Sequence, residues 1–305
     1  MKCNLCPRAC NVDRNVNTGF CGMTNDIYAA RAALHMWEEP CISGEHGSGA
    51  VFFSGCTLRC IFCQNSEIAA AQVGKKITVE RLSDIFLELQ DKCANNINLV
   101  TATHFVPQVA EALVKAKNKG LVIPVVYNSS AYENVSTLNM LDGLVDVYLP
   151  DMKYIDSRLS AEYSKAPDYA DVAKAAIHEM VRQTRKPEFF IEDDELVKSG
   201  RVEAGIMKKG VIVRHLVLPG TTKDSKAVIK YLIDTYGDDI YISIMSQYTP
   251  FERLKKHPLL SRKVTRKEYN SVVDYAIDCG INNGFIQEGD VAEESFIPEF
   301  DYEGI

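Results

Sequence analysis

Residues 50–65 read AVFFSGCTLRCIFCQN, an apolar run followed at once by three cysteines in the spacing C-x3-C-x2-C. The run 50–54 is rich in β-branched and aromatic residues, which predicts a buried strand. Cys56, Cys60 and Cys63 therefore share one loop that leaves the end of a strand. In α/β proteins the loops at the carboxyl ends of the strands carry the active site. This stretch thus predicts the fold class together with the place of its chemistry.

Similar apolar runs recur along the chain and predict five more strands, at residues 97–103, 121–127, 144–149, 211–218 and 239–245. Segments with helical spacing separate them, at residues 78–94, 109–119, 157–165, 168–184 and 222–236. A further helix begins at a possible capping box formed by Thr265 and Glu268. Apolar strands that alternate with helices indicate a parallel sheet covered by helices on its outside.

Alternation of this kind gives either a doubly wound sheet or a barrel. The first strand is followed by cysteines instead of the G-x-G-x-x-G of dinucleotide-binding folds. We therefore predict an α/β fold with a (β/α)6 partial TIM barrel at residues 49–255. Residues 1–48 are short on strand signals and rich in cysteine, which predicts a metal-binding N-terminal extension. Residues 256–305 are expected to form a C-terminal helix and an acidic tail.

Composition and charge argue against several classes of protein. The chain has 305 residues, of which 46% are hydrophobic and 25% charged, as in an ordinary globular protein. Its net charge of −7 argues against binding to nucleic acid or to an anionic membrane, since both require a basic surface. Seven acidic residues near the C-terminus equal this excess of negative charge, and we interpret them as a solvated segment. They are Glu288, Asp290, Glu293, Glu294, Glu299, Asp301 and Glu303.

The sequence also bears on localisation. No run approaches the roughly 18 apolar residues of a transmembrane helix, and the first residues have no apolar signal-peptide core. We therefore expect a cytoplasmic protein without a membrane partner. Ten cysteines are many for a compartment in which thiols stay reduced. Clustered cysteines there indicate metal ligation or redox chemistry.

The cysteine loop favours one kind of metal site. Three thiolates on a short loop can each bind one iron of a 4Fe–4S cluster, which leaves the fourth iron without a protein ligand. An open iron indicates catalysis more than storage of an electron. A structural zinc site would normally supply four protein ligands. Three unrelated core cysteines would not be expected together on this loop.

The loop 55–65, including Phe62 just before the third cysteine, resembles the signature of the radical S-adenosylmethionine (radical SAM) enzymes. The resemblance implies that Cys56, Cys60 and Cys63 hold a 4Fe–4S cluster whose open iron binds S-adenosylmethionine (SAM). It also implies reductive cleavage of SAM to a 5′-deoxyadenosyl radical, which abstracts hydrogen from the substrate. A flavodoxin or ferredoxin would supply the electron. The cofactor supplies the difficult chemistry, and the protein orients it.

Two further motifs are similar to those of glycyl-radical-enzyme activases, in particular the pyruvate formate-lyase activating enzymes. They are Asp151-Met152-Lys153 after the fourth predicted strand and RHLVLPG at residues 214–220. The resemblance implies that Lys153 and Arg214 contact the SAM carboxylate, and that Asp151 orders this corner or a bound cation. The alternative is that these charges at the strand ends simply pair with each other.

One segment departs from the pattern of that family. Its members often carry Gly-Gly-Glu after the second strand to receive the SAM amino group, whereas this chain has TATH at residues 101–104. Thr103 can accept a hydrogen bond through its hydroxyl, and His104 can do so only when neutral. His104 is equally well explained as an ordinary buried side chain. Asn128 ends the third strand and is suited to a hydrogen bond with ribose or substrate.

A second set of cysteines precedes the radical motif. Cys3, Cys6, Cys10 and Cys21 can bind zinc, a single iron or a second iron–sulfur cluster. A Cys-x2-Cys-Pro-Arg-x-Cys opening before the radical motif is similar to a group of homologues of the activating enzymes. The remaining cysteines are expected to be buried, one by default and two on the apolar faces of helices. They are Cys41, Cys93 and Cys279.

The leading hypothesis is a radical SAM enzyme that abstracts hydrogen from a protein or peptide, as an activase does from a backbone glycine. In family terms, an incompletely closed barrel leaves a lateral opening wide enough for a polypeptide loop. Two alternatives stay open. One is radical chemistry on a small molecule, and the other is an iron–sulfur binding or electron-transfer protein that does not cleave SAM.

Overall fold

The computed structural model describes residues 2–287 and 298–305. Its centre is a ten-stranded sheet in the order β10-β9-β8-β6-β5-β4-β2-β1-β3, with β7 paired to β8 beside this path. The six predicted strands are present and run parallel, so the predicted α/β fold with a mostly parallel sheet is confirmed. They are β2 (Ser48–Phe53), β4 (Ile97–Val100), β5 (Val125–Ser129), β6 (Val147–Pro150), β8 (Met207–Leu216) and β9 (Tyr241–Met245).

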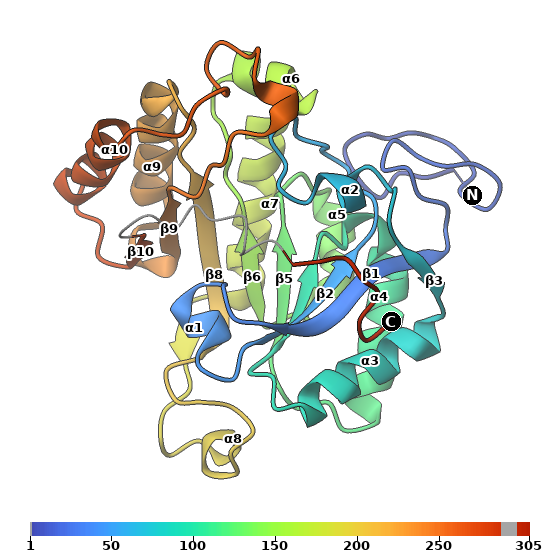
Figure 1. The fold of residues 1–305 in the computed structure, drawn as a ribbon. Coiled ribbons are helices and arrows are strands. Elements are labelled where there is room, and N and C mark those ends of the chain that lie inside the picture. Colours follow the sequence, from blue (N-terminus) through green and yellow to red (C-terminus); the bar gives the residue numbers. More distant parts are fainter. Residues whose placement is uncertain (1, 288–297) are drawn as a thin grey trace.

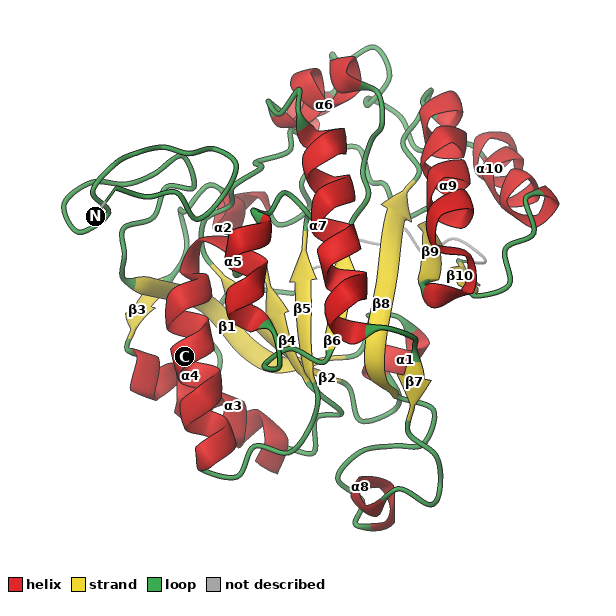
Figure 2. Cartoon of the chain, turned by 180° about the vertical axis from the view of Figure 1, so that it is seen from behind, coloured by secondary structure: helices red, strands yellow, loops and turns green. Residues whose placement is uncertain are grey.

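Helices cover the outer face of this sheet, as Figure 2 shows from behind. The predicted helices are all found, and Thr265 with Glu268 forms the predicted capping box. They are α3 (Val79–Asp91), α4 (Val106–Asn118), α6 (Ser157–Ser164), α7 (Tyr169–Thr184), α9 (Thr222–Tyr236) and α10 (Arg266–Asp278). In the described ranges no helix combines the length and the hydrophobicity needed to cross a membrane.

Shorter elements complete the chain and were not predicted. The short α-helices are α1 (Pro40–Ser43), α2 (Ser66–Ala69), α5 (Val135–Leu138) and α8 (Glu195–Lys198). Single 3-10 turns lie at Thr103–Phe105, Asn139–Leu141, Gly237–Asp239 and Glu252–Leu254. The short strands are β3 (Lys75–Ile77), β7 (Glu188–Phe189) and β10 (Gly284–Ile286). The edges β3 and β10 are not paired with each other in the part of the chain described, so the sheet is open, as a partial barrel requires.

Strand β1 (Ile27–His35) lies within residues 1–48, where the sequence carries few strand signals. It runs antiparallel to β2 with a register shift between Ala29 and Arg31. Four of its nine residues are alanines, which are weak strand formers, so propensity alone did not reveal it. Its place in the sheet comes from pairing with β2 and β3 and from burial. At its end, β1 delivers the chain to the inner face of the sheet (Figure 1).

The two faces of the first parallel strand are buried in different clusters. Val51 and Phe53 pack in the main core with the outer helices, whereas Ala50 and Phe52 belong to a small inner cluster. This alternation follows the two-residue period of a strand. Lower on the inner face, α1 packs on β5, β6 and β8 in a second apolar layer. The inner face is thus closed by apolar side chains below the strand ends, where the site lies.

The C-terminal residues that the structure describes run along β1, and their acidic side chains, Glu299, Asp301 and Glu303, are exposed. Residues 298–305 follow β1, and the Ala32 N–H donates to the Glu303 carbonyl at 2.8 Å. The Glu303 carboxylate also pairs with Arg31. The remaining part of the predicted acidic tail, residues 288–297, lies outside the described residues.

The three cysteines expected in the core have different surroundings. Cys41 in α1 is buried, as predicted. The prediction for Cys93 was wrong: α3 ends before it, its φ is 63°, and its side chain is exposed. Cys279 is half-buried at the C-terminal cap of α10.

Candidate functional site

The cysteine loop leaves the carboxyl end of β2, where the sequence placed it. Gly55 begins the loop with a φ of 86°, a conformation that favours glycine. A Cβ at this position would lie 2.7 Å from the Cys21 carbonyl oxygen and 3.1 Å from His104 Nε2. Only glycine therefore allows the N-terminal segment and the turn after β4 to approach the start of the loop so closely.

The three thiols of the loop are half-buried and lie near one another. Burial, together with the neighbouring thiol charges of Cys56 and Cys60, raises the pKa of Cys63 to about 12. The Ser164 hydroxyl donates to Cys60 Sγ at 3.0 Å, and the Leu58 N–H donates to Cys56 Sγ at 3.4 Å. Buried thiols that oppose one another's ionisation become thiolates when a metal supplies the compensating charge. This donor set therefore fits an iron–sulfur cluster.

No coordination shell is already formed within residues 2–287 and 298–305. No three His, Cys, Asp or Glu side chains there stand in a metal-binding arrangement. The assignment of the loop cysteines as ligands rests on their spacing, their shared loop and the proximity of their thiols. The same statement holds for the N-terminal set of cysteines.

Phe62 anchors the loop. Its ring is buried and meets the rings of Tyr154, Tyr163 and Tyr248 edge-on, with centroids 6.3 to 6.5 Å apart. These tyrosines come from the segment after β6, from α6 and from the segment after β9. Phe62 thus packs the cysteine loop against α6 and the segments that follow β6 and β9.

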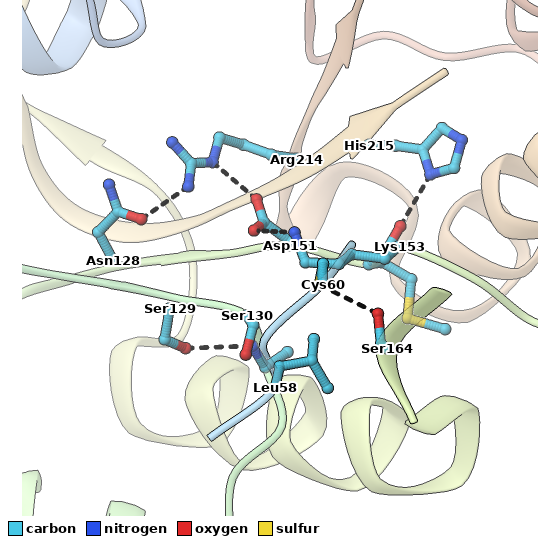
Figure 3. A network of polar contacts seen from close by, with 12 residues as sticks. Leu58, Cys60, Asn128, Ser129, Ser130, Asp151, Lys153, Ser164, Arg214 and His215 are labelled. Atoms are coloured by element: carbon cyan, nitrogen blue, oxygen red, sulfur yellow. Dashed lines mark hydrogen bonds and ion pairs between the residues drawn. The ribbon is translucent and has the colours of Figure 1, made fainter. Parts of the chain in front are cut away.

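Two predicted cations and one acid form a network at the ends of β6 and β8 (Figure 3). Lys153 Nζ lies 2.7 Å from Asp151 Oδ2, and Arg214 Nε donates to Asp151 Oδ1 at 3.1 Å. Burial raises the pKa of Asp151, but Lys153 and Arg214 outweigh this and lower it overall. The charges at these strand ends do pair with each other, which was the alternative left open by the sequence.

Arg214 is held on all sides. Its Nη1 donates to Glu38 Oε2 at 3.1 Å, and its Nη2 donates to Asn128 Oδ1 at 2.6 Å. With Asp151 on Nε, each guanidinium nitrogen has an acceptor in the protein. The donors of Arg214 are therefore committed within the protein.

Lys153 also interacts electrostatically with Cys60 of the cysteine loop. Burial lowers its pKa, yet the negative charges of Asp151 and Cys60 raise it overall. In the opposite direction, burial raises the pKa of Cys60 and the charge of Lys153 opposes that rise. Lys153 therefore remains charged and stands beside one of the three thiols.

Sequence reasoning missed two acids, Glu38 and Glu39, which follow β1 and lie close to Arg214. Glu38 Oε1 accepts from Asn98 Nδ2 and Asn128 Nδ2, each at 3.1 Å. Glu39 is 8% exposed, and burial raises its pKa. Glu39 Oε2 and Asn98 Oδ1 are buried acceptors without a hydrogen-bond partner. The available signal was Asn98, a polar residue inside an apolar strand.

The TATH segment meets a second buried acid. The Thr103 hydroxyl donates to Glu133 Oε1 at 2.6 Å, and the Tyr127 hydroxyl lies 3.4 Å from the same oxygen. Burial raises the pKa of Glu133 to about 7, and its Oε2 is buried without a partner. Glu133 follows β5 and carried no signal in the sequence.

His104 behaves as a buried side chain. Burial lowers its pKa to about 3, so the ring is neutral near pH 7. Its Nε2 lies 2.7 Å from the Ser54 carbonyl oxygen, an acceptor, so the proton belongs on Nε2. Its Nδ1 is buried without a partner. His104 thus holds the end of β2 just before the cysteine loop.

The N-terminal cysteines lie directly against the cysteine loop. The Cys56 N–H donates to the Cys21 carbonyl at 3.3 Å, and Arg8 Nε donates to the Thr57 carbonyl at 2.8 Å. In Figures 1 and 2 this segment projects beside α2 and β3. The two sets of cysteines predicted from the sequence are therefore neighbours in space.

Comparisons with known proteins agree with this geometry. The family model of the radical SAM superfamily matches residues 50–232. The uncharacterized protein MJ0674 of Methanocaldococcus jannaschii is 28% identical over 281 residues, which cover 90% of this chain and 74% of that protein.

Solved structures share the fold at low sequence identity. SuiB of Streptococcus suis, bound to its precursor peptide SuiA, matches with a TM-score of 0.50 and 14% identity over 78% of this chain. The chain spans about half of SuiB, 47% of its length. A domain of a pyruvate-formate lyase-activating enzyme from Bacteroides vulgatus has a TM-score of 0.38 and 10% identity over 60% of this chain and 91% of that domain. Such a score does not support the closer resemblance to activating enzymes, which stays a prediction.

The family match covers more than half of the chain and begins at the strand that leads into the cysteine loop. Because Cys56, Cys60 and Cys63 follow that strand within the matched residues 50–232, the chain belongs to the radical SAM superfamily.

Proposed function

We propose that this protein cleaves SAM reductively at the loop of Cys56, Cys60 and Cys63 and abstracts a hydrogen atom from a protein or peptide. Radical SAM enzymes use a 4Fe–4S cluster and SAM, and together these supply a 5′-deoxyadenosyl radical when bound. The observation that carries the proposal is the position of Lys153. It stands at the end of β6 beside Cys60, fixed by Asp151.

The residues around the loop suit the parts of SAM in different ways. A cation beside the cluster loop is suited to a carboxylate, and we assign this role to Lys153. Asp151 keeps Lys153 in place and charged, and Arg214 in turn holds Asp151. Arg214 and Glu38 in turn fix the amide of Asn128, which we assign to ribose or substrate.

The SAM amino group needs an acceptor, since Gly-Gly-Glu is absent. The Thr103 hydroxyl is already committed to Glu133, whose second carboxylate oxygen is buried without a partner. A buried acceptor of this kind is costly unless a donor pairs with it. We therefore assign the amino group to the Thr103–Glu133 pair, with His104 in a supporting role at the strand end.

A protein or peptide substrate is supported by the exposed end of β1. Leu34, Met36 and Trp37 are 38%, 43% and 59% exposed, and they border a hollow of about 170 Å³. Neighbouring apolar side chains in solvent mark an interaction surface. The next residue along the chain is Glu38, so the surface leads directly to the polar layer below the cysteine loop. SuiB, which shares the fold, was solved with a precursor peptide.

A small polar substrate is the second candidate, and a separate observation favours it. Glu39 Oε2 and Asn98 Oδ1 are buried acceptors without partners in the layer below the strand ends. Such groups are suited to a compact molecule that carries hydrogen-bond donors. The two candidates differ in size, so transfer of deuterium from labelled peptides or labelled small molecules into 5′-deoxyadenosine separates them.

Further parts of the proposal rest on the sequence. We assign metal binding, as zinc or a second iron–sulfur cluster, to residues 1–48, and catalysis to the barrel at 49–255, followed by the C-terminal segment 256–305. The electron donor is a flavodoxin or ferredoxin, and the location is the cytoplasm. The activase-like role belongs to this proposal as well.

The decisive experiment measures 5′-deoxyadenosine. Anaerobically reconstituted protein is reduced with titanium(III) citrate in the presence of SAM, and products are quantified by liquid chromatography. Wild-type protein should form 5′-deoxyadenosine and methionine, while C56A/C60A/C63A should form none. Cys93→Ala, at an exposed cysteine outside the site, is the matched control. A fully loaded wild-type protein that leaves SAM intact would instead be an iron–sulfur binding or electron-transfer protein.

A further inference from the structure

We infer that Cys3, Cys6, Cys10 and Cys21 hold a second iron–sulfur cluster. Electrons pass from it to the loop of Cys56, Cys60 and Cys63, here called the radical loop, through the hydrogen bond between Cys21 and Cys56. The inference rests on the proposed function, because it needs an electron acceptor at the radical loop. It assigns iron and not zinc to the N-terminal cysteines, and it assigns electron transfer to that site.

The sulfurs of the two cysteine sets have the same kind of hydrogen-bond partner. In the radical loop, the Leu58 N–H donates to Cys56 Sγ, two residues before it. In the N-terminal segment, the Arg8 N–H stands in the same relation to Cys6. The Phe20 N–H donates to Cys10 Sγ at 3.2 Å. Hydrogen bonds to the sulfurs are among the features that set the potential of an iron–sulfur cluster.

The N-terminal thiols also lie near one another. A Cβ placed on Gly19 would lie 3.5 Å from Cys21 Sγ and 3.6 Å from Cys10 Sγ, so both sulfurs face the same residue. Burial raises the pKa of Cys6 to about 12, and the charges of Cys10 and Cys21 act in the same direction. The N-terminal thiols are thus gathered around one point, as the thiols of the radical loop are.

A backbone hydrogen bond and a cation–π contact join the two sets of cysteines. The Cys56 N–H donates to the Cys21 carbonyl at 3.3 Å, so a ligand residue of one set is bonded to a ligand residue of the other. The guanidinium of Arg59 lies 5.5 Å from the centroid of the Phe20 ring, which reinforces this contact. The covalent path from one thiol to the other crosses a single hydrogen bond. Zinc has no redox chemistry, so zinc would make no use of this path.

The N-terminal segment reaches the surface of the molecule. Val16, within this segment, is 75% exposed, and Cys3 and Cys10 are half-buried. The segment projects beside α2 and β3 in Figure 1. An electron carrier can therefore approach residues 3–21 without entering the space where SAM and substrate are proposed to bind.

The electron balance is simple. A low-potential donor protein of the flavodoxin or ferredoxin class loses one electron and is oxidised by one equivalent. The N-terminal site receives this electron and passes it on, returning to its oxidised state. One electron is delivered to the radical loop for each SAM cleaved, and no atom or proton moves between the two sites.

The first test counts metal and sulfide after anaerobic reconstitution. Wild-type protein should contain about eight irons, and C3A/C6A/C10A/C21A about four. The control C93A/C279A lacks two cysteines outside both sets and should retain about eight. Zinc in the wild type, released by the quadruple substitution with iron unchanged, overturns the inference.

The second test separates the relay from the proposed function. Titanium(III) citrate, a small reductant, should reach the radical loop directly, so the quadruple variant should still form 5′-deoxyadenosine with it. With reduced flavodoxin as donor, the rate in the variant should fall by about tenfold or more. An equal rate in variant and wild type with flavodoxin overturns the relay. No product from the wild type with either reductant overturns the proposed function instead.

A spectroscopic test on the wild type does not depend on the folding of a variant. Two reduced clusters joined through Cys21 and Cys56 should interact magnetically in electron paramagnetic resonance, with broadened lines and fast spin relaxation. Spectra that are a simple sum of two isolated centres, or that show one centre only, contradict the inference.

Discussion

His104 Nε2 lies 2.7 Å from the carbonyl oxygen of Ser54, the residue that precedes the start of the cysteine loop. Through this bond the turn after β4 holds the end of β2. The histidine fulfils this role as a neutral donor, because burial lowers its pKa to about 3. The bond therefore couples the stability of the site to pH.

Replacing His104 with Phe leaves the Ser54 carbonyl without its donor and should lower the free energy of unfolding by about 1–3 kcal/mol. The unfolded chain takes up a proton near pH 6.5, whereas the folded chain does so only near pH 3. The contribution of His104 to the free energy of unfolding is thus complete above pH 6.5 and declines as the pH falls toward 3. The difference in this free energy between wild type and variant should therefore become smaller at low pH. Urea unfolding at several pH values measures this, with exposed His178→Phe as control. A difference that is constant with pH would contradict the neutral state of His104.

Lys153 and Arg214 should respond differently to substitution. Lys153→Met should weaken SAM binding by about tenfold to a hundredfold, because a charged hydrogen bond is lost. Arg214→Ala removes the cation paired with Glu38 and one of the two cations paired with Asp151, and should lower stability by about 3–5 kcal/mol. Calorimetry with SAM and thermal unfolding measure the two effects. If Lys153→Met binds SAM as the wild type does, the carboxylate lies elsewhere. Exposed Lys198→Met is the control.

The Glu133 carboxyl should make SAM binding depend on pH. Its pKa is raised to about 7 by burial, so the carboxylate form becomes dominant above that pH. If this carboxylate holds the SAM amino group, affinity for SAM should rise between pH 6 and pH 8. Glu133→Gln should bind more weakly and remove this rise, which titration calorimetry over the same range measures. A rise that persists in Glu133→Gln would assign it to another group.

The raised pKa of Glu133 should make the stability of the fold change with pH in the opposite direction to SAM binding. A carboxyl with a pKa above its usual value stabilises the folded state at low pH, and this contribution is lost as pH rises through about 7. Wild-type protein without SAM should therefore lose stability relative to Glu133→Gln between pH 5 and pH 8. The two pH dependences, of binding and of stability, thus have opposite signs and identify one residue.

Gly55 should tolerate no side chain. In Gly55→Ala, the left-handed backbone costs about 1–2 kcal/mol and the clash with the Cys21 carbonyl adds about 1–3 kcal/mol. Gly143→Ala is the matched control, since its φ is 76° and no atom lies within 4 Å of the added Cβ. Urea unfolding should show a larger loss for Gly55→Ala than for the control. Equal losses would show that the N-terminal segment yields freely at this contact.

The regular part of the fold was readable from the sequence because each element repeats a local pattern. The six parallel strands are short apolar runs, and α3 and α10 have Thr78 and Thr265 at their N-terminal caps. The cysteine loop was readable for the same reason, since its spacing is local. Where a pattern was weak, as in the alanine-rich β1, the strand was missed.

The partners within the site were not readable, because they come from distant parts of the chain. Glu38 reaches Arg214 only because β1 adds antiparallel to β2. Glu133 meets Thr103 because β4 and β5 are neighbours, and nothing in the sequence singles it out among the acids. Lys153 was predicted, but its ion pair with Asp151 depends on burial that only the assembled sheet provides.

The segment 298–305 has a consequence for the behaviour of the protein in solution. Its backbone pairs with Ala30 and Ala32 of β1, so it covers hydrogen-bonding groups that would otherwise face water along the strand. An uncovered strand of this kind is a template for pairing with other molecules, which leads to aggregation. An affinity tag that displaces these residues should therefore lower the yield of monomeric protein, and tags are better placed elsewhere.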